Sequence, residues 1–279
     1  MIRSCLFIPA NNPAMIQNAD LFGADAVIFD LEDAVAVEEK DAARSLLREY
    51  FKVFAPAARV FVRVNNAPEW LLPDLEAVFS DKIDAVILPK ADAAACGRLR
   101  EALLRLEKER RISKSIGIIP LIESARAVLA ADSLASLSGV VGLMLGAEDF
   151  TADMEIERSK SGEEISYPRA RIAIAARANR VIAVDTPFTD VNDEDGLASD
   201  AARARALGMS AKAAIHPRQV EIINRVFSPR PAQIEWATRV LEKSKAEKGV
   251  FSLDGKMVDQ PVIERAKTII EKAKRYKLL

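Results

Sequence analysis

Acidic side chains that could bind a hard metal ion occur at two places near the middle of the chain, each directly after an apolar run. Glu123 follows IGIIPLI, and Glu148 and Asp149 follow VVGLMLGA. Carboxylates without a nearby imidazole or thiolate suit Mg²⁺, which takes one or two of them and fills its octahedron with water and substrate oxygens. Glu123 and Asp149 therefore indicate a magnesium site. A pair of acids that is salt-bridged to neighbouring cations is the alternative, and the residue types alone leave it equally open.

A guanidinium and an ammonium end two further apolar runs. Arg63 closes VFVR, where a buried guanidinium is costly unless it meets an anion such as a carboxylate, an enolate or an acidic side chain. The acids of FDLED, residues 29–33, could hold Arg63 and would then be supports rather than catalysts. Lys90 follows AVILP and could form a Schiff base if burial lowered its pKa. Carboxylates around Lys90 would instead raise that pKa, which favours a structural or electrostatic role.

Histidine and cysteine are scarce, and this excludes several kinds of site. The chain has one histidine, His216, and two cysteines, Cys5 and Cys96, without metal-ligand spacing. A histidine-rich zinc site is excluded, and a Ser-His-Asp triad is disfavoured. We expect both cysteines to be reduced and buried in a cytoplasmic protein. Proton chemistry must therefore use carboxylates, arginine, lysine or a hard metal ion.

Eight short apolar runs carry these side chains, at intervals of about 25 to 40 residues with helical periodicity between them. This alternation is typical of βα units around a parallel sheet, and its length fits an α/β fold of the (β/α)₈ TIM barrel type. A doubly wound open sheet is the alternative, but it requires a Gly-rich turn after the first strand, where this chain has IPANNPA. The runs are CLFIP from 5, AVIFDLED from 26, VFVRVN from 60, AVILPK from 85, IGIIPLIES from 116, VVGLMLGAED from 140, VIAVDTPF from 181 and AKAAIHP from 211.

Polar residues gather at the ends of these runs. Because the carboxyl ends of all barrel strands surround one mouth, we expect these side chains to form one site there. Loops are solvated in any fold, but charged groups at seven of the eight ends exceed what solvation requires. The residues are Asp30, Glu32, Asp33, Arg63, Asn65, Lys90, Glu123, Glu148, Asp149, Asp185 and His216.

The last part of the chain departs from the βα pattern. SPRP at 228–231 indicates a linker, helix 232–248 and the extended stretch GVFSLDGKMVD follow, and Pro261 lies near the start of a final helix. We expect a barrel domain at 1–227 and a C-terminal lid at 228–279. A lid of this size is too small for a core of its own and should fold over its own barrel or a neighbour's.

Charge and hydropathy argue against two classes of partner. The net charge is −1, from 40 Lys and Arg against 41 Asp and Glu, without a long run of like charge. We therefore expect no nucleic-acid partner. The apolar run before Pro9 is too short for a signal peptide or a membrane span, so we expect no membrane association.

Several sequence blocks keep an order and spacing that coincidence does not explain, from residue 3 to about residue 266. They are RSCLFIPANNPAM, ADAVIFDLEDAVAVEEKDAAR, VFVRVNN, DAVILPKAD, IIPLIESARAVL, LGAEDFTADM, AIHPRQ and GVFSLDGKMVDQPVIERA. With these blocks the chain resembles the citrate lyase β-subunit (citryl-CoA lyase) family, within the HpcH/HpaI aldolase and citrate lyase superfamily. The resemblance implies a barrel with a C-terminal lid, Mg²⁺ as cofactor, a CoA or acyl-carrier-protein thioester as substrate, and a homotrimer or hexamer.

The resemblance also implies roles for individual residues. It implies that Glu123 and Asp149 bind Mg²⁺. It also implies that the substrate is bound by Arg63, Glu123 and the GAED stretch, which contains Glu148 and Asp149. Asp259 of GKMVD matches the family's catalytic carboxylate, which enters the site from a neighbouring subunit.

Four further candidates for substrate binding are Arg3, Lys40, Arg44 and His216. The first three match positions where relatives hold the CoA phosphates, although ordinary solvated helix charge is favoured for Lys40 and Arg44 from their spacing alone. His216 stands where many relatives have Asn, and residues 157–171 also differ from citrate lyase subunits. These departures concern the acyl group rather than the reaction class.

The implied reaction is retro-Claisen cleavage of citryl-CoA to acetyl-CoA and oxaloacetate. Mg²⁺ would acidify the substrate hydroxyl, Arg63 would stabilise the thioester oxyanion, and Asp259 would exchange a proton. The alternatives are a malyl-CoA or citramalyl-CoA lyase, a metal-dependent 2-oxo acid aldolase, and a non-enzymatic scaffold subunit within a citrate lyase assembly of partner subunits.

Overall fold

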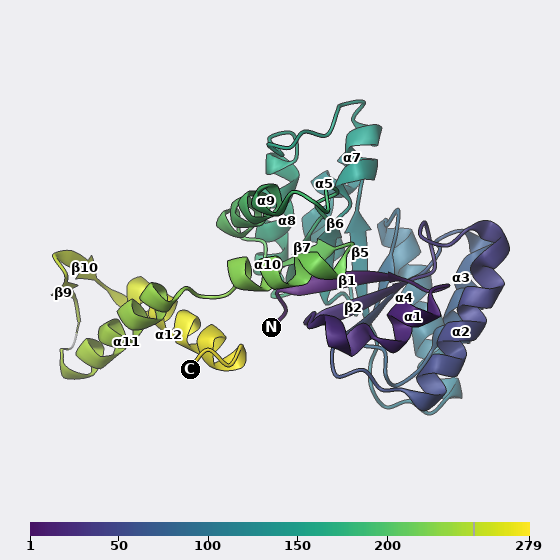
Figure 1. Cartoon of the computed structure of the whole chain (residues 1–279), viewed down its shortest axis with the longest axis horizontal. Helices are drawn as coiled ribbons and strands as arrows, with labels where there is room; N and C mark the ends of the chain where they lie inside the picture. Colours follow the sequence, from purple (N-terminus) through teal and green to yellow (C-terminus); the bar gives the residue numbers. More distant parts are fainter. Residues whose placement is uncertain (248) are drawn as a thin grey trace. The chain divides into compact units, whose positions relative to one another are not determined.

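The computed structural model describes residues 1–247 and 249–279, which form two compact units (Figure 1). Ile2–Asn224 is the first unit, and Arg225–Leu279 together with Met1 is the second. The division falls after Asn224, inside helix α10 (Pro217–Phe227), whereas the sequence placed the domain boundary after residue 227.

Eight parallel strands close a barrel in chain order, with β8 pairing back onto β1. The predicted (β/α)₈ barrel with a C-terminal helical extension is therefore confirmed. The strands are β1 (Ser4–Pro9), β2 (Ala26–Asp30), β3 (Arg59–Arg63), β4 (Ala85–Leu88), β5 (Gly117–Ile122), β6 (Gly142–Leu145), β7 (Ile182–Asp185) and β8 (Ala211–Ala214).

Side chains that point into the barrel fill its interior with a hydrophobic cluster. Phe61, Ile87 and Ile119 come from β3, β4 and β5, and Met144 comes from β6. Cys5 belongs to the same cluster, and its burial raises the pKa of the thiol, as expected for an inert cysteine. The strands read as continuous apolar runs because their outer faces are also covered, by the helices.

Helices connect successive strands. Asn12, Asp92, Ser124 and Asp193 cap the first turns of four of them, each accepting a hydrogen bond from a backbone N–H three residues on. The helices of the first unit are α1 (Pro13–Gln17), α2 (Lys40–Val53), α3 (Pro68–Val78), α4 (Ala93–Glu109), α5 (Ala125–Leu129), α6 (Ala131–Ala135), α7 (Ala147–Asp153), α8 (Ser166–Ala178), α9 (Glu194–Ala206) and α10 (Pro217–Phe227), with 3₁₀ turns η1 (Ala19–Phe22) and η2 (Val37–Glu39).

A buried ionic network lies between β7, β8 and the helices outside them. Arg169 of α8 donates two hydrogen bonds to Asp185, at 2.8 and 3.0 Å, and also contacts Asp200 of α9. Lys212 of β8 donates to Asp185 at 2.7 Å and to Asp200 at 2.6 Å. Asp185 is fully buried against the helices. The expectation that its side chain joins the barrel mouth is therefore wrong.

The second unit consists of α11 (Pro231–Ala246), β9 (Phe251–Leu253), β10 (Lys256–Val258) and α12 (Gln260–Arg275). The two strands form an antiparallel hairpin whose turn residues Asp254 and Gly255 have φ of 52° and 74°, a conformation that glycine adopts easily. Phe251 and Val258 pack with Ala237, Val240 and Ala266 from the two helices. The unit thus has a hydrophobic cluster of its own, contrary to the expectation from its length.

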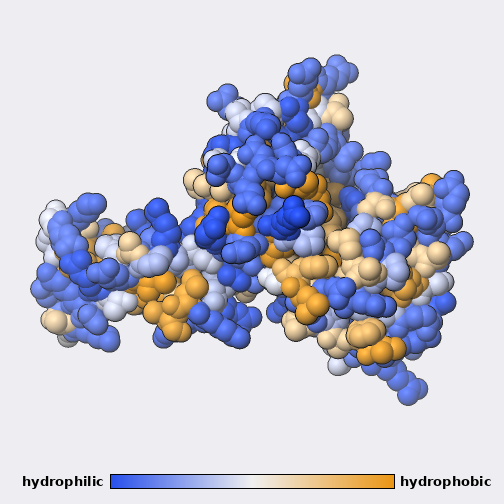
Figure 2. Space-filling model, in the orientation of Figure 1, coloured by the Kyte–Doolittle hydropathy of each residue, from blue (hydrophilic) through white to orange (hydrophobic). Residues whose placement is uncertain are grey.

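On the face drawn in Figure 2, each unit presents mainly hydrophilic side chains and smaller hydrophobic patches. Among the described helices, none combines the length and the apolar character that crossing a membrane requires.

Candidate active site

A cavity of about 490 Å³, here called the central cavity, lies at the carboxyl ends of the strands. Its charged lining includes Asp30, Arg63, Glu123 and Asp149, which come from the ends of β2, β3 and β5 and from the start of α7. The barrel therefore brings these four predicted residues together, as parallel strands in closed order require. Phe7, Met144 and Ile215 supply apolar wall.

Arg63 is held in a fixed plane by Asp30. Its Nε donates to Asp30 Oδ1 at 2.7 Å and its Nη2 donates to Oδ2 at 2.6 Å, while the guanidinium lies 5.1 Å from the ring centroid of Phe7. Burial alone would lower the pKa of Arg63, but the hydrogen bonds and charge of Asp30, with Glu32 and Asp33 behind them, raise it above its ordinary value. The planar two-bond geometry is one that arginine provides and lysine cannot.

Glu32 also faces Arg63, but this contact stabilises the Glu32 carboxylate less than the contact with Asp30 stabilises the Asp30 carboxylate. Its Oε2 lies 2.8 Å from Arg63 Nη1, yet among the described residues this buried oxygen has no well-aligned hydrogen bond. Burial raises the pKa of Glu32 to about 8 against the opposing effect of Arg63, and the charges of Asp33, Asp30 and Glu123 add to the rise. One guanidinium therefore does not neutralise the acids that surround it.

Glu123 projects from the end of β5 and is 5% exposed. Its Oε1 accepts a hydrogen bond from the backbone N–H of Lys90, a residue with φ of 48°. A Cβ at position 146 would lie 2.9 Å from both the Cβ and the Oε2 of Glu123, so only glycine leaves the carboxylate room there. Burial raises the pKa of Glu123 to about 7, the Lys90 N–H opposes this, and Asp149 contributes to the rise.

The carboxylates of Glu123 and Asp149 suit a hard cation that takes only one or two ligands from the protein. Burial raises the pKa of Glu123 although the charges of Arg63 and Lys90 oppose the rise, and Asp149 lies on the same cavity wall from the first turn of α7. Within residues 1–247 and 249–279, no cluster of three or more His, Cys, Asp and Glu could hold a metal. A four-ligand zinc site is thus not supported, whereas Mg²⁺ completes its coordination with water and substrate.

Glu148 lines the same cavity but turns partly to solvent. Its Oε1 accepts a hydrogen bond from Arg158 Nε at 3.1 Å, and its side chain is 60% exposed. Arg158 also contacts Glu164. The loop after α7 therefore supplies an arginine to Glu148, the chain neighbour of Asp149.

Three of the predicted CoA-phosphate residues are engaged with the protein itself. Arg3 precedes β1, at the amino ends of the strands, and donates to Asp25 from Nε and Nη2 at 2.8 Å. Lys40 Nζ donates to the carbonyl oxygens of Leu31 and Glu32 at 2.8 Å, and Arg44 contacts Asp74 at 2.8 Å. The structure brings none of the three to the central cavity, although Lys40 lines a neighbouring hollow with Glu32 and Lys90.

The remaining two predicted residues lie in different settings. His216 follows β8, is half-buried, and accepts a hydrogen bond from the Arg218 N–H at 3.2 Å through Nδ1. The central cavity is lined by its neighbour Ile215 instead. Asp259 belongs to the second unit, where its side chain accepts from the Val262 N–H at 3.3 Å and caps α12.

Comparison with known proteins gives matches along nearly the whole chain. The HpcH/HpaI aldolase/citrate lyase family matches residues 3–217. The citrate lyase subunit beta of Escherichia coli K12 is 39% identical over 282 residues, which cover 97% of this chain and 93% of the relative. A (3S)-malyl-CoA thioesterase of Cereibacter sphaeroides is 34% identical over 277 residues, 97% of this chain and 94% of the relative.

The chain belongs to the HpcH/HpaI aldolase/citrate lyase family. It is accordingly an enzyme of the lyase class. Among solved structures of this family, the protein CitE from Mycobacterium tuberculosis in complex with magnesium, acetoacetate and coenzyme A superimposes with a TM-score of 0.80 at 32% identity and covers 98% of both chains.

Two contributors to the site in this family member have no strong signal in the sequence. Gly146 makes room for Glu123, and the Lys90 backbone N–H binds that carboxylate. Gly146 is part of the LGAED block, and a glycine directly before an acidic helix start is the one signal that could have indicated its role.

The raised pKa of Glu32 predicts a pH dependence of stability. Folded protein binds the Glu32 proton more tightly than unfolded protein, whose pKa is the ordinary value of 4.5, so this residue's contribution falls as pH rises from about 4.5 through about 8. Between pH 6 and pH 8, the free energy of unfolding should fall by about 2 kcal/mol more in the native protein than in Glu32→Gln. Urea denaturation at both pH values measures the difference. Parallel pH profiles for the two proteins would show that Glu32 is already ionised at pH 6.

Proposed function

We propose that this protein is a Mg²⁺-dependent carbon–carbon lyase that cleaves citryl-CoA to acetyl-CoA and oxaloacetate by retro-Claisen chemistry. The observation that carries the proposal is one cavity lined by Glu123, Asp149 and the planar Arg63–Asp30 pair. Support comes from relatives named citrate lyase subunit beta, and from a solved relative that contains magnesium, acetoacetate and coenzyme A.

Glu123 and Asp149 would hold the metal ion. Glu123 is buried and Asp149 is exposed on the same cavity wall. Burial and the charge of Asp149 raise the pKa of Glu123, so a divalent cation bound by both carboxylates would replace the proton on Glu123. The bound cation would supply Lewis-acid chemistry, which lowers the pKa of a substrate hydroxyl and orients the adjacent carboxylate. Gly146 and the Lys90 N–H keep the Glu123 carboxylate in place for this task.

Arg63 would stabilise the charge that develops when the carbon–carbon bond breaks. Bond cleavage moves an electron pair onto the thioester enolate, and a guanidinium already fixed by Asp30 can donate to that oxygen without reorganising. Its raised pKa keeps it charged throughout. Neither a redox step nor a covalent intermediate with the protein is needed.

Asp259 would donate a proton to the enolate carbon as general acid and act as general base in the reverse direction. The proton that the substrate hydroxyl loses would return Asp259 to its protonated form through solvent, so the overall step balances. We propose that residues 228–279 act as a lid whose Asp259 enters the site of a neighbouring subunit in a homotrimer or hexamer. Its place beside the β9–β10 hairpin, in a unit with its own hydrophobic cluster, would present the carboxylate from a stable support.

The acyl group, carrier and setting are also parts of the proposal. Malyl-CoA and citramalyl-CoA differ from citryl-CoA at one substituent and remain the alternative substrates, and a free-acid aldolase would dispense with the thioester. The relative named (3S)-malyl-CoA thioesterase favours thioester hydrolysis as a second candidate reaction. We propose a cytoplasmic enzyme, and co-purification tests whether it assembles with partner subunits of a citrate lyase.

Substitution of the metal carboxylates tests the function directly. Glu123→Gln and Asp149→Asn keep the side-chain shape but remove a negative charge, so each should lower Mg²⁺-dependent formation of acetyl-CoA from citryl-CoA by about 10²-fold or more. Each should also weaken Mg²⁺ binding in calorimetry. Glu157→Gln, on an exposed loop residue, is the matched control and should change neither quantity. Metal-independent cleavage, or release of free CoA without acetyl-CoA, would contradict the proposal.

A conservative substitution separates a catalytic role of Asp259 from its role as the N-cap of α12. Asn caps a helix about as well as Asp, so Asp259→Asn should keep the thermal stability of the native protein while turnover falls by about 10²-fold or more. Reassembly of Asp259→Asn chains with Arg63→Ala chains should restore part of the activity if the carboxylate acts in a neighbouring site. Full activity of Asp259→Asn would leave this residue with its capping role alone.

A further inference from the structure

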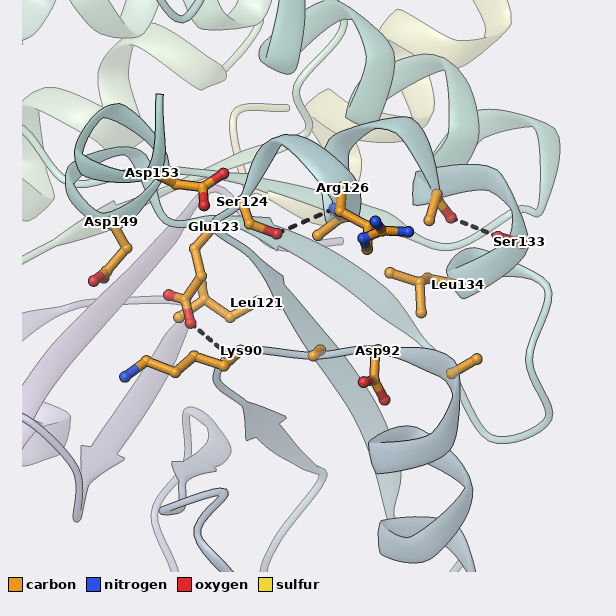
Figure 3. A pocket seen from close by; sticks show the side chains of 14 residues that line it. Lys90, Asp92, Leu121, Glu123, Ser124, Arg126, Ser133, Leu134, Asp149 and Asp153 are labelled. Carbon is orange, nitrogen blue, oxygen red and sulfur yellow. Dashed lines mark hydrogen bonds between the residues drawn. The ribbon is translucent and has the colours of Figure 1, made fainter. Parts of the chain in front are cut away.

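A second cavity opens on the other side of the candidate metal carboxylates. This α5 cavity has a volume of about 570 Å³ and shares Leu121, Glu123 and Asp149 with the central cavity. In Figure 3, Glu123 and Asp149 lie at its left and Arg126 of α5 lies to their right, above Asp92. A ligand bound at the two carboxylates can therefore extend into either cavity.

Most polar groups in the α5 cavity are already engaged with the backbone. Asp92 accepts from the Ala95 N–H at 2.7 Å, and Asp153 accepts from the Ala125 N–H at 2.7 Å. Ser124 accepts from a backbone N–H at 3.2 Å, and Ser133 donates to a backbone carbonyl at 2.8 Å. These residues shape the cavity, but each has given up part of its capacity to bind a ligand.

Arg126 is different because its guanidinium remains available. Across the described residues 1–247 and 249–279, no carboxylate forms an ion pair with it and no acceptor forms a side-chain hydrogen bond with it. The side chain is exposed and lines the cavity. Lys90 extends toward the opposite side in Figure 3. Arg126 therefore offers several unused donors to an anion that reaches this cavity from Glu123 and Asp149.

We propose that Arg126 binds a second free carboxylate of the acyl group, and so selects substrates that carry a carboxymethyl substituent on the hydroxyl-bearing carbon. This inference rests on the proposed function. The hydroxyl and its adjacent carboxylate would meet Glu123 and Asp149 through the metal, and the thioester would lie toward Arg63. The remaining substituent then extends into the α5 cavity. That substituent is carboxymethyl in citryl-CoA, methyl in citramalyl-CoA and hydrogen in malyl-CoA.

Arg126→Ala separates these substrates. It should lower kcat/KM for citryl-CoA by about 10-fold or more, mainly through a higher KM, and change kcat/KM for citramalyl-CoA by no more than about twofold. Arg126→Lys should recover part of the loss and show the stronger salt dependence of a point charge. Arg177→Ala, an exposed arginine near the end of α8, is the matched control and should change neither value. Equal losses for both substrates, or no loss for citryl-CoA, overturn the inference.

Binding of the free 2-oxo acids distinguishes this inference from the proposed function. Oxaloacetate carries the carboxymethyl group and pyruvate carries the methyl group, so Arg126→Ala should weaken the Mg²⁺-dependent binding of oxaloacetate about 10-fold and leave that of pyruvate unchanged in calorimetry. This result would stand even if the native protein cleaved no thioester, in which case only the proposed reaction fails. Unchanged oxaloacetate binding in Arg126→Ala would overturn the role of Arg126 whatever the protein cleaves.

Discussion

The two hydrogen bonds from Arg63 to Asp30 are the interaction on which the barrel mouth depends. They join the ends of β2 and β3 and fix a guanidinium in one plane among several carboxylates. Asp30 is 1% exposed and also accepts from the backbone N–H groups of Glu32 and Ala34. The pair therefore organises both the strand ends and the loop that follows β2, and a lysine at position 63 could not replace its planar geometry.

An excess of buried acid around that pair determines what the site can bind. Arg63 is matched by Asp30, which leaves Glu32 and Glu123 with pKa values raised to about 8 and about 7. Such groups hold a proton near neutral pH unless a cation replaces it. A divalent cation at Glu123 and Asp149 removes this imbalance and leaves coordination positions open to a substrate. The electrostatics of the mouth and the chemistry of the proposed reaction thus favour the same kind of ion.

The sequence predicted the barrel and much of its mouth because buried parallel strands and polar strand ends leave clear signals. It could not predict where each terminal side chain points. Asp30 and Asp185 both end strands, yet Asp30 meets Arg63 in the mouth while Asp185 faces Arg169 and the outer helices. Strands that are apolar on both faces show no alternation, so a one-residue difference in register is invisible. The core of the second unit was missed because its short β9–β10 hairpin resembles an extended loop.

The central claim is that Glu123 and Asp149 share one divalent cation that also binds the 2-oxo acid. Crystals grown with Mn²⁺ in place of Mg²⁺ and with oxaloacetate test it most directly, because the anomalous signal of Mn²⁺ locates the ion. The account predicts one strong peak with a carboxylate oxygen of Glu123, one of Asp149 and two oxygens of oxaloacetate at about 2.0–2.3 Å. Oxaloacetate bound without a metal peak, or a peak whose protein ligands exclude both carboxylates, would contradict it.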